Sequence, residues 1–61
     1  MKELNFVIQG NYGQGWEDVS FYPCGYRQIN FGTAWKNCKK DFKEYCCSGY
    51  SHRIIKRYEK I

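Results

Sequence analysis

The sequence has 61 residues, with 10 lysines and arginines against 6 aspartates and glutamates, a formal net charge of +4, and 2 Trp, 6 Tyr and 4 Phe. A chain this short forms one domain, residues 1–61, and buries only about 60% of the surface that its unfolded form exposes, which excludes a multidomain enzyme and leaves little room for a water-excluding catalytic pocket. The positive charge suits nucleic acid, an acidic protein surface or an anionic membrane, and small domains also carry such a charge for solubility alone.

A β-hairpin is predicted at the start of the chain. Apolar and mixed side chains alternate over residues 4–9, with Leu4, Phe6 and Ile8 on one side, which is typical of a strand. The loop over residues 10–15 has three glycines, which adopt positive φ angles at little steric cost. We expect the returning strand over residues 16–19, beginning at Trp16.

The segment that follows gives weaker signals. Pro23 and Gly25 indicate a turn after residue 20. Residues 26–31 are consistent either with a short strand, which would be a fourth in the sheet, or with an irregular segment.

One clear helix is predicted from Gly32-Thr33 to Ser48-Gly49. Thr33 is the expected N-cap, because its hydroxyl can accept a hydrogen bond from a free amide of the first turn, and Gly49 suits the turn that ends a helix. Lysines occupy the solvent-facing positions. Apolar side chains recur at spacings of three and four and predict the face that packs on the sheet: Trp35, Cys38, Phe42, Tyr45 and Cys46.

A last strand is predicted over residues 52–58, where Ile54 and Ile55 have basic neighbours. A right-handed crossover places it beside the first strand, so the sheet order is second, first, last. The sequence therefore predicts an α+β fold: a small three- or four-stranded antiparallel sheet (β-β-α-β) with one helix packed on one face and the other face open to solvent.

The four cysteines admit several interpretations. No apolar run is long enough for a signal core or a membrane span, which favours the cytoplasm and reduced thiols. Cys38 and Cys46 are then expected as small buried hydrophobes, with Cys47 exposed. A secreted peptide with two disulfides is the opposing interpretation. A zinc site would need Cys24, Cys38, either Cys46 or Cys47, and His52, but the chain lacks a Cys-x-x-Cys pair, and we predict no metal and no cofactor.

We predict no catalytic residues. The glycine loop lacks the Gly-Lys-Ser/Thr ending of a phosphate-binding loop and does not lead into a helix, so it is expected to be a structural turn. Glu17 and Asp18 are adjacent and point to opposite faces of a strand, so they cannot act as a pair. Pairing of His52 with Cys46 or Cys47 stays open as the arrangement closest to a nucleophile and its base.

Both ends of the chain resemble a group of very small bacteriophage and prophage proteins. In that group a strand ending in Ile-Gln precedes Tyr-Gly-x-Gly-Trp-Glu-Asp, as Ile8-Gln9-Gly10-Asn11-Tyr12-Gly13-Gln14-Gly15-Trp16-Glu17-Asp18 does here. The helix end Phe42-Lys43-Glu44-Tyr45 and the closing Arg53-Ile54-Ile55-Lys56-Arg57 are also similar. The resemblance covers about half of the chain, and residues 20–30 depart from it as an insertion. It implies a phage origin and a host-cytoplasmic setting, but no chemistry.

The resulting hypothesis is a non-catalytic phage-type protein that binds a host macromolecule and inhibits or redirects it. Its sharpest form is an anti-defence protein, such as an inhibitor of a CRISPR effector. The expected partner is a host protein or ribonucleoprotein, with no membrane, and a homodimer is a further option. The contact surface is predicted from exposed-type aromatic and basic side chains: Tyr12, Tyr22, Tyr26, Tyr50, Arg53 and Arg57.

Two alternatives stay open. In the first, the protein is a small basic nucleic-acid-binding protein, in which cations hold phosphates and rings stack on bases. Lys36, Lys40 and Lys56 would carry that function together with Arg53 and Arg57. The second alternative is the secreted, disulfide-stabilised peptide.

Overall fold

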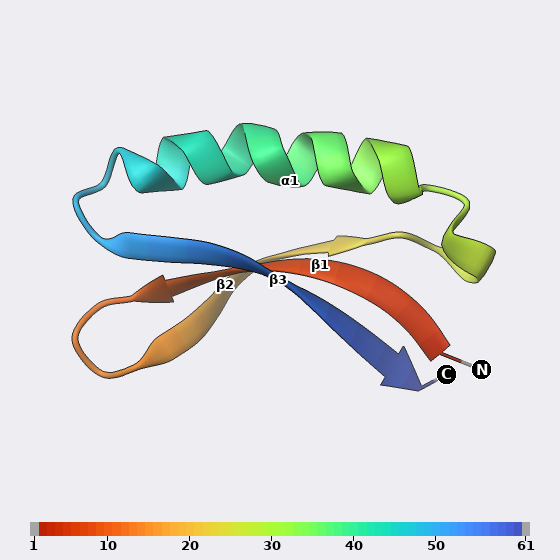
Figure 1. Ribbon diagram of the computed structural model, residues 1–61, viewed down its shortest axis with the longest axis horizontal. Coiled ribbons are helices and arrows are strands. Elements are labelled where there is room, and N and C mark those ends of the chain that lie inside the picture. Colours follow the sequence, from red (N-terminus) through yellow and green to blue (C-terminus); the bar gives the residue numbers. More distant parts are fainter. Residues whose placement is uncertain (1, 61) are drawn as a thin grey trace.

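A computed structural model describes residues 2–60. The elements follow the order β1 (Lys2–Asn11), β2 (Trp16–Pro23), a short 3₁₀ helix η1 (Tyr26–Gln28), α1 (Phe31–Cys46) and β3 (Ser51–Lys60). In Figure 1, α1 lies along one face of the sheet, with the β1–β2 loop near its carboxyl end and η1 at its amino end. This arrangement confirms the predicted α+β fold.

The sheet described in residues 2–60 has three strands in the order β2-β1-β3, with β1 antiparallel to both neighbours. This is the order expected from a right-handed crossover. β1 pairs along its whole length with β3, from Lys2 opposite Lys60 to Asn11 opposite Ser51. The central strand β1 therefore pairs with β3 along its full length and with β2 from Asn5 to Asn11.

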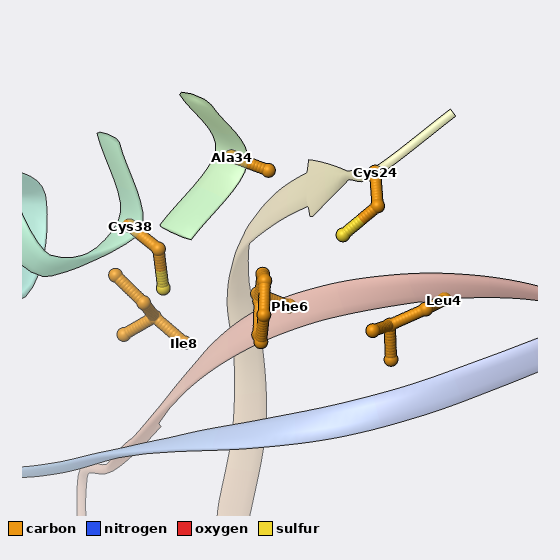
Figure 2. Close-up of a cluster of buried hydrophobic side chains, with 6 residues drawn as sticks. All are labelled: Leu4, Phe6, Ile8, Cys24, Ala34 and Cys38. Carbon is orange, nitrogen blue, oxygen red and sulfur yellow. The ribbon is translucent and has the colours of Figure 1, made fainter. Parts of the chain in front are cut away.

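The core lies between β1 and α1. Leu4, Phe6 and Ile8 are buried on the helix side of β1, as the alternation predicted, and Ala34 and Cys38 of the helix cover them. Figure 2 shows these side chains together with Cys24, which follows β2. Cys24 is fully buried, and its amide donates to the carbonyl of Leu4 at 3.0 Å. The burial of Cys24 and its hydrogen bond to Leu4 hold the end of β2 against the beginning of β1.

A β-bulge explains why β2 is longer than predicted. Ile8 pairs with Ser20 but Gln9 pairs with Asp18, so Val19 is an extra residue. The bulge shifts the alternation of side chains by one position. Asp18 therefore points away from the helix, whereas Ser20 points toward it and bonds to Tyr45. Pro23 is the last residue of β2, an edge strand that tolerates a proline at its end, and a turn with Gly25 at a φ of 79° follows, as Pro23 and Gly25 predicted.

Residues 24–30 form a compact turn. The amide of Asn30 donates to the carbonyl of Cys24 at 2.7 Å, and Arg27 and Gln28 have φ angles of 53° and 59°. Left-handed backbone of this kind cannot continue a strand. Of the two options for residues 26–31, the structure has the irregular one, and a fourth strand does not form within residues 2–60.

Both ends of α1 lie nearer the amino terminus than predicted, with the N-cap at Asn30, three residues before Thr33. Asn30 precedes the first turn, and its backbone carbonyl accepts a hydrogen bond from the amide of Ala34 at 2.8 Å. Thr33 therefore lies inside the helix, and the predicted N-cap was wrong. The helix ends at Cys46, and Gly49 adopts a φ of 88° in the turn toward β3. Cys46 is exposed, which corrects its predicted burial, because at the last position of α1 it lies beyond the core cluster.

The face opposite α1 carries no second layer within residues 2–60, but its centre is not open to solvent as predicted. Val7 is fully buried, and Asn5 and Gln9 are nearly so. Val7 lies directly between Phe21 of β2 and Ile55 of β3. Cross-strand neighbours on a twisted sheet thus shield the central strand with their own side chains.

The core position of Phe6 generates a stability prediction. Phe6→Leu removes ring contacts to two helix aromatics and should lower the free energy of unfolding by about 1–2 kcal/mol. Phe21→Leu is the matched control, because Phe21 is 54% exposed on the other face, and should cost less than about 0.5 kcal/mol. Urea titration followed by circular dichroism measures both, and equal losses would contradict this placement of the core.

Candidate binding surfaces

Exposed aromatic rings surround the buried Phe6 on the side of α1 that faces β3. Phe31 and Trp35 contact the Phe6 ring, with centroids 5.2 and 5.0 Å apart, yet they remain 41% and 38% exposed. Lys56 of β3 lies opposite Phe6 in the strand register and therefore on the same sheet face. Tyr58, opposite Leu4, lies on that face too and is 57% exposed. We define the α1–β3 flank as these rings and the lysines around them: Phe31, Trp35, Tyr58, Lys36, Lys39, Lys40, Lys43 and Lys56.

The orientation of α1 places its lysines on this flank. Tyr22 donates to Asp41 at 2.6 Å, and Ser20 and Tyr45 are hydrogen-bonded at 2.7 Å, so one side of the helix is held against β2. The opposite side carries Trp35, with Lys39 Nζ 5.7 Å from its ring centroid, a cation–π distance. An open recess of about 350 Å³ is lined there by Trp35, Lys36, Lys39, Lys40 and Lys43.

The carboxylates lie away from the α1–β3 flank. They occupy the edge of α1 toward β2, the strand β2 itself, and the far end of the opposite sheet face: Asp41 and Glu44, Glu17 and Asp18, and Glu3 and Glu59. Among residues 2–60 the one ion pair joins Arg57 to Asp18, and it does not involve a lysine of the flank. Within residues 2–60, no lysine of the flank is therefore held in an ion pair, although Glu44 lies four residues after Lys40 on the helix.

On the opposite face, Arg53 and Arg57 belong to an internal network. Arg57 donates two hydrogen bonds to Asp18, at 2.6 and 3.1 Å. Gln9 donates to Asp18 at 2.8 Å and accepts from Arg53 at 2.9 Å. Arg53 also lies over the Trp16 ring, 4.2 Å from its centroid. The network joins β2, β1 and β3, so both predicted contact arginines also have a structural role.

The network lowers the pKa of Asp18, mainly through the hydrogen bonds from Arg57 and then from Gln9. The pKa of Arg57 is raised by the same pair. A carboxyl with a depressed native pKa stabilises the fold above its unfolded value of 3.8. That contribution is lost as the pH falls through the lowered native pKa.

We therefore expect Asp18→Asn to reduce stability at neutral pH by a small but measurable amount, with the difference from the wild type shrinking as the pH falls below 3.8 and through the lowered native pKa. Urea unfolding at a series of pH values measures this. Glu17→Gln is the control, since the neighbouring carboxylate points to the other face and should show no such convergence. A constant Asp18→Asn deficit at all pH values would contradict the ion pair.

The β1–β2 loop and the start of β3 form an aromatic cluster. The Tyr12 ring lies over Gly10, where an added Cβ would be 2.6 Å from the Tyr12 hydroxyl, so glycine permits this close approach. Tyr12 contacts Tyr50 at a centroid distance of 5.0 Å and its hydroxyl lies 3.1 Å from His52 Nε2. Tyr45 also contacts the His52 ring, at 5.1 Å. The cluster joins the hairpin loop to the end of α1.

The six predicted contact residues therefore occupy several places. The structure brings Tyr12 and Tyr50 together at the hairpin end and Arg53 and Arg57 together on the face opposite α1. Tyr22 is half-buried beneath α1, where burial and the hydrogen bond to Asp41 raise its pKa to about 12. Tyr26 is exposed on η1 with Arg27 over its ring.

Prediction from the sequence missed two rings of the flank. Phe31 fell in a segment of uncertain structure, and Trp35 was assigned to the helix face that packs on the sheet. Tyr58 was identified, as a ring that could stack on a base in the nucleic-acid alternative. The signal available was the spacing of four between Phe31 and Trp35, next to lysines at 36, 39, 40 and 43.

Neither a metal centre nor a nucleophile–base pair is formed in residues 2–60. All four cysteines are free, and no group of three or more His, Cys, Asp or Glu side chains converges there. His52 Nδ1 faces the carbonyl of Tyr50 at 3.0 Å, so this nitrogen donates and Nε2 accepts from Tyr12. Within the described chain, both ring nitrogens thus have partners other than Cys46 and Cys47.

The cysteines divide by accessibility. Cys24 and Cys38 are buried, and desolvation raises the pKa of both thiols, that of Cys38 to about 11. Cys46 and Cys47 are exposed after the last turn of α1. Because the thiolate is the reactive species, we expect a thiol reagent at about pH 8 to modify two sites rapidly in the native protein and the others only on unfolding. Mass spectrometry counts the adducts, and rapid labelling of Cys24 or Cys38 would contradict the packing.

Among residues 2–60, no helix has the length and apolar character needed to cross a bilayer. Searches for a matching family model, a similar curated protein or a similar solved structure found no match to this chain.

Proposed function

We propose that this protein is a non-catalytic binding protein that holds a host macromolecule on its α1–β3 flank and thereby inhibits or redirects it. The observation that carries the proposal is the grouping, on one side of the molecule, of exposed rings and of lysines that form no ion pair within residues 2–60. Phe31 and Trp35 are anchored on Phe6, so their exposed parts are held in place before a partner arrives. Such preorganised aromatic surface is typical of binding sites.

The biological setting proposed for this function is a phage-infected bacterium. Its support is the resemblance of residues 8–18 and 53–57 to small phage proteins, together with a fold too small for a water-excluding pocket. A protein of this kind would act by occupying the surface of its target, as an anti-defence inhibitor does. A CRISPR effector is the sharpest candidate for that target.

A comparative pull-down from bacterial lysate tests the proposal. The baits are the wild type, a flank variant combining Trp35→Ala with Lys39→Ala, and the control Phe21→Ala on the opposite face, each checked for folding by circular dichroism. We expect the wild type and the control to retain the same host component in stoichiometric amount, and the flank variant to lose at least about tenfold, as removal of an anchor ring in an interface does.

Parallel samples treated with nuclease identify the class of partner that is retained. The flank would not be the binding surface if all three baits retained the same component equally. Failure of every bait to retain a stoichiometric component would contradict the proposed function itself.

A further inference from the structure

We infer that the α1–β3 flank binds single-stranded nucleic acid, with its lysines on the phosphates and its rings against the bases. This inference rests on the proposed function and specifies the partner that the flank recognises. It also separates the flank lysines from Arg53 and Arg57, which the sequence grouped with them.

The charge distribution identifies a polyanion as the ligand. Lys36, Lys39, Lys40 and Lys43 share one recess on α1, and Lys56 lies beyond Phe6 on β3. The carboxylates of the chain lie on the β2 side or on the opposite face. Lysine ammonium groups act as point charges that suit phosphate oxygens arranged along a backbone.

The exposed rings favour a single strand over a duplex. Trp35, Phe31 and Tyr58 present large exposed fractions beside the lysines. In a duplex the base faces are already stacked, so rings placed between phosphate-binding lysines would gain nothing from them. In a single strand each base has a free π-face, and stacking on an aromatic ring contributes about 1–3 kcal/mol per base.

Anchoring of the rings adds to this argument. Trp35 is fixed below by Phe6 and approached from the side by the Lys39 ammonium. A base that stacks on its exposed surface therefore meets a ring that has already lost its rotational freedom.

The arginines of the opposite face are a contrasting set. Arg57 is bound to Asp18, while Arg53 is bound to Gln9 and lies over Trp16. Arg57 donates from both terminal nitrogens to Asp18, and Arg53 donates from Nε to Gln9, so both guanidinium groups already have contacts within the protein. The fluorescence of Trp35 therefore reports on the face with the flank lysines, and the fluorescence of Trp16 reports on the face with the two arginines.

The test titrates the full chain with an oligothymidylate of roughly 15 nucleotides, within the range of single-strand site sizes. Trp16→Phe leaves Trp35 as the only tryptophan, and Trp35→Phe leaves Trp16. We expect the oligonucleotide to quench the fluorescence of Trp16→Phe strongly and that of Trp35→Phe little. If the oligonucleotide quenched only the Trp35→Phe variant, whose remaining tryptophan is Trp16, the assignment to the flank would be overturned.

Salt dependence supplies the second readout. If four or five lysines each neutralise a phosphate, the logarithm of the binding constant should fall with the logarithm of salt concentration with a slope of about −3. Replacing Lys36 and Lys40 with alanine should weaken binding roughly tenfold and reduce that slope by about 1.4. Lys2→Ala with Lys60→Ala removes the same charge at the far end of the sheet and should change both values little.

Three results would overturn the inference: no binding at low salt, equal or tighter binding of a duplex of the same length, and equal effects of the two lysine pairs. These results are distinct from failure of the proposed function. A flank that retains a host protein after nuclease treatment, without affinity for oligothymidylate, contradicts the nucleic-acid inference alone.

Discussion

The rest of the structure depends on burial of the central strand from both sides. β1 presents Leu4, Phe6 and Ile8 to the helix and Val7 to the side chains of its two neighbours, and residues 4–10 are all buried. A domain of this size has little apolar surface to bury, so one strand that is covered on both faces accounts for much of its core. The helix, both edge strands and the turn at Cys24 are positioned by their contacts with that strand.

Coverage of β1 leaves different surfaces on its two sides. On the helix side, one α-helix covers a sheet of three strands within residues 2–60, and its polar contacts to Ser20 and Tyr22 hold it toward β2. The rings on its other side complete the burial of Phe6, and their own outer surfaces leave Phe31 and Trp35 41% and 38% exposed. The exposed aromatic surface is thus a geometric consequence of covering three strands with a single helix.

The elements that local pattern determines were predicted correctly, and the errors occur where distant contacts decide. Alternation identified β1, and spacing of three and four identified α1 and the burial of Cys38. The bulge at Val19 inverted the alternation that would have extended β2, and left-handed backbone at Arg27 and Gln28 has no signature in residue type. The candidate site was less predictable, because the bonds that occupy Arg53 and Arg57 join residues 44 and 39 positions apart.

The division of charge between the two faces follows from the same architecture. On the face without a helix, the central strand is shielded by side chains of its neighbours. Phe21 and Ile55 flank Val7, and the planar donor groups of Arg53 and Arg57 reach Gln9 and Asp18. On the helix side, packing already covers the core, so Lys36, Lys39, Lys40 and Lys43 are not required to cover it. A cation that has no structural task is free to meet an external anion, and this is the physical basis for proposing the helix side, and not the more arginine-rich face, as the binding surface.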